Sequence, residues 1–135
     1  MTKRHFVSYT NPSSQIAEQF RTIRTNIQFS SIDQKHKTLI ITSPSSGEGK
    51  TTSAINLAIS ISQQGERVLL IDANLRRPTL HTSFNLKDSY GLTDVLMGRV
   101  SLEEATLQTQ IGRLEVLTSG IIPPNPTELI GSKAM

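Results

Sequence analysis

The feature that most constrains this chain is the segment Thr38–Thr52, where a short apolar run enters a turn rich in serine and glycine. The run Leu39–Ile41 predicts a strand over 38–42, and helical spacing begins at Lys50. A glycine-rich turn that leads into a helix N-terminus offers backbone N–H groups to an anion, and a lysine there adds positive charge. The segment therefore predicts a loop that binds the phosphates of a nucleoside triphosphate.

Two side chains at the start of the helix suit this task. Lys50 is expected to reach the outer phosphates, and the hydroxyl of Thr51 is placed to ligate Mg²⁺. The strict pattern G-x-x-x-x-G-K-[ST] has a glycine where Pro44 stands, so the loop is a variant with a stiffer entry. The residues expected around the phosphates are Ser46, Gly47, Glu48, Gly49, Lys50, Thr51 and Thr52.

A dinucleotide-binding turn is the competing interpretation of the glycines. It would need G-x-G-x-x-G or a small residue at the third position, where this chain has Thr52. An acid about 20 residues further on is also typical of such a turn, and Asp72 would meet that requirement. The pair Lys50-Thr51 decides in favour of the triphosphate loop.

The residues after the loop predict a βαβ unit. A helix over Lys50–Gln64 ends at Gly65, and Arg67–Asp72 has the continuous apolar character of a strand buried on both faces. Ligands of parallel sheets bind at the carboxyl ends of strands, so Asp72 is expected beside the phosphate loop. A strand-end Asp often only shapes a turn, but after such a loop a role at Mg²⁺ is favoured. Arg76 could bind phosphate or brace the loop, and both interpretations stay open.

The N-terminal part divides into an arm and a helix. Met1–Pro12 shows no periodicity and is expected to be mobile, whereas Ser13 or Ser14 can cap an amphipathic helix. Its apolar stripe consists of Ile16, Phe20, Ile23 and Ile27, and a second face holds Glu18, Arg21 and Arg24 at intervals of three. That second face is either solvated, with one weak ion pair, or a contact to another molecule.

Composition excludes several function classes. The formal charge is +3 with the basic residues scattered, so no nucleic acid partner is expected. The absence of cysteine excludes disulfides and thiol catalysis, and no apolar segment approaches the ~20 residues of a membrane span. His5, His36 and His81 lack metal-ligand spacing.

Further elements are predicted beyond Pro78. Gly91–Gly98 indicates a short helix, and Ser101 with Glu104 forms a capping box for a helix continued by Ala105 and Leu107. A strand is expected over Leu114–Thr118. Asn125 can cap a last helix, with Pro126 at its first position.

With these motifs in order, the chain resembles the cytoplasmic protein-tyrosine kinases of Gram-positive capsule and exopolysaccharide operons, a bacterial family with Walker motifs. The resemblance runs from about Ser14 to the last residue, and several specific motifs support it. They are 18–29, the loop 42–52, a second motif over 68–78 and the segment 119–129.

The resemblance implies roles for individual residues. Lys50 and Asp72 would be catalytic, with ATP as cofactor and Mg²⁺ held by Thr51 and Asp72. The helix with Glu18, Arg21 and Arg24 would join subunits into a ring-like homo-oligomer that phosphorylates protein tyrosines in trans. A transmembrane modulator would activate the kinase through its cytoplasmic tail, which places the chain in the cytoplasm at the inner face of the membrane.

Three departures from the family pattern are visible. Asn74 stands where a second Asp is usual and could still offer an oxygen to the metal. No later apolar strand ends in Asp, and the only tyrosines are Tyr9 and Tyr90 rather than a C-terminal cluster. We therefore expect the N-terminal portion of a longer kinase, truncated at its C-terminus.

The expected fold is α/β, a P-loop NTPase-like and mostly parallel sheet with flanking helices, incomplete at the C-terminus and preceded by the amphipathic helix. Residues 1–36 would form the arm and oligomerisation helix, and 37–135 the nucleotide-binding kinase domain. Two alternatives remain. Partitioning and division-site ATPases share the architecture, but Ser45 replaces their additional lysine. The other is an inactive ATP-binding or oligomerisation module.

Overall fold

The computed structural model describes residues 6–29, 38–41, 48–86, 90–122, 124–133 and 135. The chain forms two compact units, one made of Thr2–Val68 with Ile111–Leu114 and the other of Leu69–Gln110 with Glu115–Met135. The predicted division between residues 36 and 37 stays a prediction. Within the described ranges, no helix combines the length and apolar character that crossing a membrane requires.

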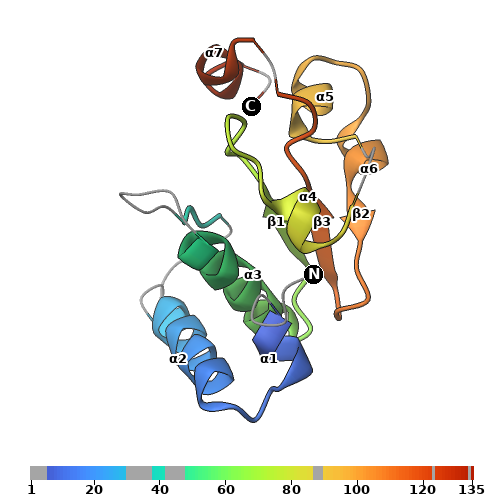
Figure 1. The fold of residues 1–135 in the computed structure, drawn as a ribbon. Helices are drawn as coiled ribbons and strands as arrows, with labels where there is room; N and C mark the ends of the chain where they lie inside the picture. Colours follow the sequence, from blue (N-terminus) through green and yellow to red (C-terminus); the bar gives the residue numbers. More distant parts are fainter. Residues whose placement is uncertain (1–5, 30–37, 42–47, 87–89, 123, 134) are drawn as a thin grey trace. The chain divides into compact units, whose positions relative to one another are not determined.

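Three helices pack together in the first unit (Figure 1). They are α1 (Val7–Thr10), α2 (Gln15–Phe29) and α3 (Glu48–Ser62). The expectation of a mobile arm over Met1–Pro12 is wrong where the arm is described, because Phe6 and Ser8 are buried. One helical turn is too short to show a period, and the partners that hold it lie far along the chain. The sequence therefore could not reveal α1.

The helix α2 begins as predicted but packs differently. The Oγ of Ser14 accepts a hydrogen bond from the backbone N of Ala17 at 3.1 Å, as an N-cap does. The predicted apolar stripe is only partly right, because Ala17 is buried whereas Ile16 and Ile23 are 52% and 43% exposed. The packed side includes Ala17 and Arg24, seven positions apart, so packing rather than the apolar period sets the orientation of the helix.

The helix α3 confirms the prediction of a broad buried surface. Ile55 and Ile59 are fully buried. Asn56 and Ser60, the residues that follow them, are buried to the same extent. The helix is followed by a turn in which Gly65 has φ 85°, a left-handed conformation that favours glycine. The predicted stop signal at Gly65 is therefore confirmed.

The strand predicted over 38–42 is not formed in its described part, 38–41. Leu39, Ile40 and Ile41 are all exposed, Ile40 by 88%. An apolar run becomes a strand only where a neighbouring strand takes up its backbone hydrogen bonds, and no described strand pairs with this one. Thr42 lies outside the described residues.

The sheet contains β1 (Val68–Ile71), β2 (Leu107–Gln108) and β3 (Leu114–Leu117) in the order β1-β3-β2. Hydrogen bonds from Val68 N to Arg113 O and from Asp72 N to Leu117 O advance in the same direction, so β1 and β3 are parallel. The strands β2 and β3 are antiparallel. The described sheet is thus mixed, and β2 begins at Leu107, where a continued helix was expected.

The expected burial of 67–72 on both faces is wrong. Leu69 and Ile71 are exposed, while Val68 and Leu70 are half-buried. Among the described strands β1 pairs with β3 alone, and the side chains of Leu69 and Ile71 lie on a face of β1 that the described residues leave exposed. A continuous apolar run cannot distinguish an edge strand from a central one.

The second unit contains four short helices, of which the last three contribute side chains to its core or pack against it: α4 (Leu80–Ser83), α5 (Leu92–Leu96), α6 (Leu102–Ala105) and α7 (Pro126–Ile130). The core consists of Leu75, Leu92, Ala105 and Leu117. The predicted capping box is confirmed, because Glu104 N donates to Ser101 Oγ and Ser101 N donates to Glu104 Oε1. The helix α7 begins at Pro126 with Asn125 in the N-cap position, as predicted, but the side chain of Asn125 makes no capping bond.

Candidate nucleotide site

The expected phosphate-binding residues that are described lie in the first turn of α3. Lys50 is half-buried, the side chain of Thr51 is buried, and Thr52 is half-buried. The first backbone N–H groups of an α-helix have no partner within the helix, so this end can accept an anion. Ser46 and Gly47 lie outside the described residues, and Glu48 and Gly49 are the first two residues of α3.

Sequence reasoning missed a residue that supports this turn. Asn56 is fully buried, and its Nδ2 donates a hydrogen bond to the carbonyl oxygen of Thr52 at 2.8 Å. An asparagine between apolar neighbours on a buried helix face is unfavourable for a helix unless its amide is bonded. That conflict between residue type and position was the available signal.

Asp72 follows β1 and organises the loop after it. Its Oδ2 accepts hydrogen bonds from the backbone N of Thr79 at 2.9 Å and of Leu80 at 3.0 Å, and its Oδ1 accepts one from Asn74 N at 3.1 Å. The carboxylate thus bonds N–H groups at the start of α4, where a helix leaves them without partners. A carboxylate has about four acceptor positions, so Asp72 retains capacity for one further ligand.

The oxygen-bearing side chains proposed for Mg²⁺ fit the chemistry of that ion. Hard cations prefer carboxylate, amide and hydroxyl oxygens, which Asp72, Asn74 and Thr51 supply. The Oδ1 of Asn74 accepts a hydrogen bond from Arg77 N at 3.2 Å, within the same loop. Thr51 and Asp72 belong to different compact units, so their proximity stays a prediction.

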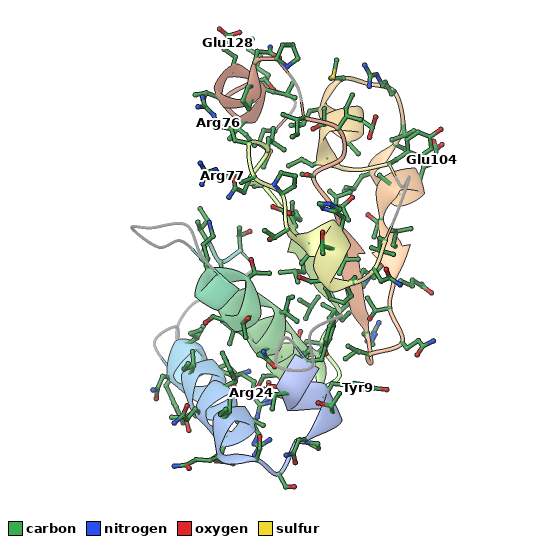
Figure 2. The ribbon with its side chains drawn as sticks, viewed as in Figure 1. Tyr9, Arg24, Arg76, Arg77, Glu104 and Glu128 are labelled. Atoms are coloured by element: carbon green, nitrogen blue, oxygen red, sulfur yellow. The ribbon has the colours of Figure 1, made fainter. Side chains whose placement is uncertain are left out.

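Arg76 contacts a distant segment of its own unit. Its Nη2 donates to the Oγ1 of Thr127 in α7 at 3.1 Å, and Figure 2 shows it beside that helix. This bond joins residues 51 positions apart and corresponds to the bracing interpretation. A contact of Arg76 with phosphate stays a prediction.

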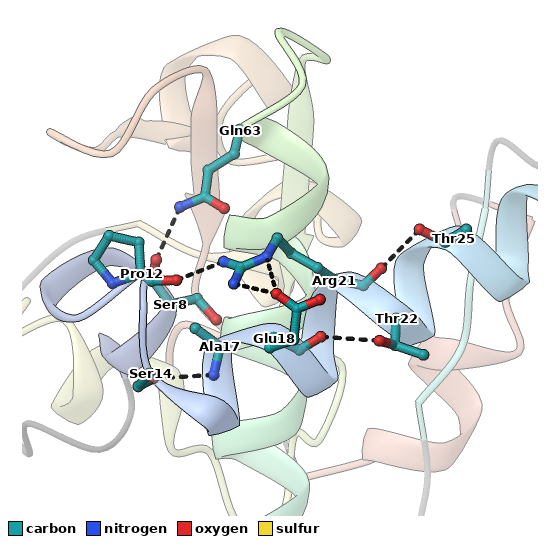
Figure 3. A network of polar contacts seen from close by, with 9 residues as sticks. All are labelled: Ser8, Pro12, Ser14, Ala17, Glu18, Arg21, Thr22, Thr25 and Gln63. Carbon is teal, nitrogen blue, oxygen red and sulfur yellow. Dashed lines mark hydrogen bonds and ion pairs between the residues drawn. The ribbon is translucent and has the colours of Figure 1, made fainter.

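The three charged residues expected at a subunit contact have partners inside the chain. Arg21 forms an ion pair with Glu18 at 2.6 Å and donates from Nη1 to the carbonyl oxygen of Pro12 (Figure 3). Arg24 donates from Nη1 to the carbonyl oxygen of Ser60 in α3 at 2.6 Å. Arg21, paired with Glu18, therefore connects α2 to the turn before it, and Arg24 connects α2 to α3.

Comparison with known proteins supplies the family. The model described as "CobQ/CobB/MinD/ParA nucleotide binding domain" matches residues 39–124. The tyrosine-protein kinase YwqD of Bacillus subtilis is 53% identical over 133 residues, which are 98% of this chain and 56% of that protein. The putative tyrosine-protein kinase CapB of Staphylococcus aureus is 40% identical over 92% of this chain and 54% of its own length.

Solved structures agree with these relatives. The chimerical protein CapA2B2 superposes with a TM-score of 0.91 at 42% identity, covering 96% of this chain and 57% of that one. The kinase domain of the Escherichia coli tyrosine kinase ETK gives a TM-score of 0.86 at 34% identity, over 93% of this chain and 49% of its own. The chain spans about half the length of the curated relatives it matches.

Proposed function

Because the chain belongs to the CobQ/CobB/MinD/ParA nucleotide-binding domain family, we propose that it binds ATP with Mg²⁺ as part of a protein-tyrosine kinase. The observation that supports this most strongly is the 53% identity to YwqD over 98% of the chain. The position of Lys50 and Thr51 at the N-terminus of α3 supports the nucleotide part.

The proposed chemistry is the transfer of the γ-phosphoryl group of ATP to a tyrosine hydroxyl. Lys50 and the N–H groups of the first turn of α3 would hold the phosphates and neutralise their charge. Thr51 and Asp72, with Asn74 as a further oxygen donor, would hold Mg²⁺, which balances charge on the phosphate oxygens. Asp72 would also assist the tyrosine hydroxyl. Catalysis of this type depends mainly on positioning.

The proposed setting is the regulation of capsule or exopolysaccharide synthesis. CapB and CpsD, which is a tyrosine-protein kinase of Streptococcus agalactiae, have names that support a role in capsule production. The partners would be further copies of the chain in a ring, the cytoplasmic tail of a transmembrane modulator, and tyrosine-containing substrates. The modulator would place the chain at the inner face of the cell membrane.

A labelling experiment tests this function. The chain and a chimera extended by the C-terminal part of YwqD are incubated with labelled ATP, Mg²⁺ and the modulator tail. We expect the chimera to label tyrosine and Lys50→Met to abolish the label, because the phosphates lose their point charge. Phosphate release without tyrosine label would favour the partitioning-type ATPase, and nucleotide binding with neither product would favour the inactive module. Absence of nucleotide binding would exclude both enzymes.

The proposed oligomer is tested best at Glu18. Its side chain is 66% exposed, and the ion pair with Arg21 contributes only ~0.5 kcal/mol to stability at such a position. If this face joins subunits, Glu18→Ala should reduce an assembly to monomers in light scattering while the circular dichroism spectrum stays the same. Arg24→Ala is a poorer probe because it removes the bond to Ser60 O inside the chain. An unchanged mass for Glu18→Ala would favour a solvated face.

A further inference from the structure

Ser8 in the one-turn helix α1 is bonded by two side chains, that of Asn56 in α3 and that of Gln63, the residue after α3. The backbone N of Ser8 donates to Asn56 Oδ1 at 2.9 Å, and Gln63 Nε2 donates to the carbonyl oxygen of Ser8 at 2.8 Å. Figure 3 shows the second of these bonds. Ser8 is 1% exposed, so both of its backbone groups are bonded away from bulk water. Losing either bond would leave a buried polar group unpaired, which is costly.

The amide of Asn56 connects α1 with the first turn of α3. Its Oδ1 accepts from Ser8 N, and its Nδ2 donates to Thr52 O, so both ends of the amide are bonded. A flip of the amide would oppose donor to donor and acceptor to acceptor. Asn56 is fully buried, and both bonds favour the same orientation of its amide.

Thr52 lies in the turn that contains Lys50 and Thr51, the residues proposed to hold phosphate and metal. We propose that Asn56 is a positioning residue for this turn, and that α1 docked through Ser8 and Gln63 strengthens nucleotide binding. The inference rests on the proposed nucleotide binding. If α1 leaves α3, Asn56 loses the bond from Ser8 N, which is one of the two bonds described above that orient its amide toward Thr52.

Binding of α1 to α3 and binding of nucleotide are then coupled equilibria. Coupling of this kind is reciprocal, so a docked α1 raises nucleotide affinity by the factor by which nucleotide favours docking. If α1 only stabilised the fold, nucleotide binding would not change the docking of α1. The two quantities can be measured independently on the same chain.

The test uses the 135-residue chain and a matched pair of variants. Gln63→Ala removes the bond to Ser8 O, while Gln64→Ala changes the neighbouring glutamine, whose Oε1 accepts from Gln28 of α2 instead. Both glutamines are exposed, so both variants are expected to fold. We expect Gln63→Ala to weaken the binding of ATP–Mg²⁺ about fivefold in titration calorimetry, at the lower end of usual coupling factors, and Gln64→Ala to leave it unchanged.

Hydrogen exchange supplies the reciprocal measurement. The amide of Ser8 should exchange more slowly when ATP–Mg²⁺ is bound to the unmodified chain, and this protection should disappear in Gln63→Ala. Equal affinities of Gln63→Ala and the unmodified chain, or no protection of Ser8, would overturn the coupling while leaving nucleotide binding intact. If the unmodified chain binds no nucleotide, the proposed function fails, and the coupling fails with it.

Discussion

Replacing Gly91 with alanine should strongly destabilise the second unit. A Cβ at this position would lie 2.1 Å from the backbone N of Gly120 and 2.5 Å from its Cα. The two segments cannot separate easily, because Leu92 N donates to Thr118 O at 2.7 Å and Thr93 N donates to Ser119 O at 2.9 Å. The backbone of Gly120 occupies the place of the added methyl group, and these two hydrogen bonds hold the two segments at this separation.

The substitution is expected to lower the free energy of unfolding, because it breaks these hydrogen bonds and disturbs the packing of Leu92 and Leu117 in the core next to them. Gly91 N also donates to Asp94 Oδ2 at 2.9 Å, so displacing Gly91 disturbs the start of α5. Together these losses should exceed ~4 kcal/mol, which is a large part of the ~5–15 kcal/mol that stabilises an ordinary domain. Chemical denaturation followed by circular dichroism would show either no folded baseline or a transition at much lower denaturant.

Two other glycines serve as controls. Gly131 has an ordinary backbone conformation and a nearest contact of 3.5 Å for an added Cβ, so Gly131→Ala should be nearly neutral. Gly98 has φ 76° with open space around it among the described residues, and Gly98→Ala should cost only ~1–2 kcal/mol of backbone strain. If Gly91→Ala proved as stable as Gly131→Ala, the close approach to Gly120 would be wrong.

The elements that the sequence predicted correctly are those with local signals. The helix α3 follows from its apolar surface and from Gly65, and α6 follows from the capping box of Ser101 and Glu104. Each of these signals lies within a few residues of the boundary that it sets. Such features depend little on the rest of the chain.

The features that the sequence did not predict depend on distant partners. The helix α1 is held by Asn56 and Gln63, which are 48 and 55 residues from Ser8. The exposure of Leu69 and Ile71 depends on which elements pack against that face of β1, and an apolar run has no information about them. Tertiary contacts therefore decided these outcomes.

The candidate site shows the same division. The candidate phosphate loop could be proposed because such a loop requires its residue types in a fixed order, here from Gly47 to Thr51. The motif identified Asp72 as an acid at a strand end. It gave no sign that the following loop folds back toward Asp72, so that the backbone N–H groups of Thr79 and Leu80 both donate to its Oδ2. The bond of Arg24 to Ser60 O was equally invisible, since it joins residues 36 positions apart.

Asp72→Ala should destabilise the chain even without nucleotide. The substitution leaves the backbone N–H groups of Asn74, Thr79 and Leu80 without their acceptor. Hydrogen bonds to a charged group contribute more than neutral ones, but Asp72 is only half-buried, and water can replace part of the loss. We therefore expect a loss of ~2–3 kcal/mol, which lowers the melting temperature by about ten degrees in a chain of this size.

A measurement in EDTA separates this structural role from the proposed role at Mg²⁺. Without metal and nucleotide, Asp72→Ala should still melt well below the unmodified chain, whereas Asn74→Ala, which removes only the bond to Arg77 N, should lose ~1 kcal/mol. Thr51→Val should lose the Mg²⁺-dependent part of nucleotide affinity, because it removes the hydroxyl proposed to ligate the metal. If Asp72→Ala melts like the unmodified chain in EDTA, Asp72 does not brace its loop. Any loss of activity in that variant would then be attributed to the metal site. If the melting temperature falls instead, a loss of activity could result from instability, so activity alone cannot assign Asp72 to catalysis.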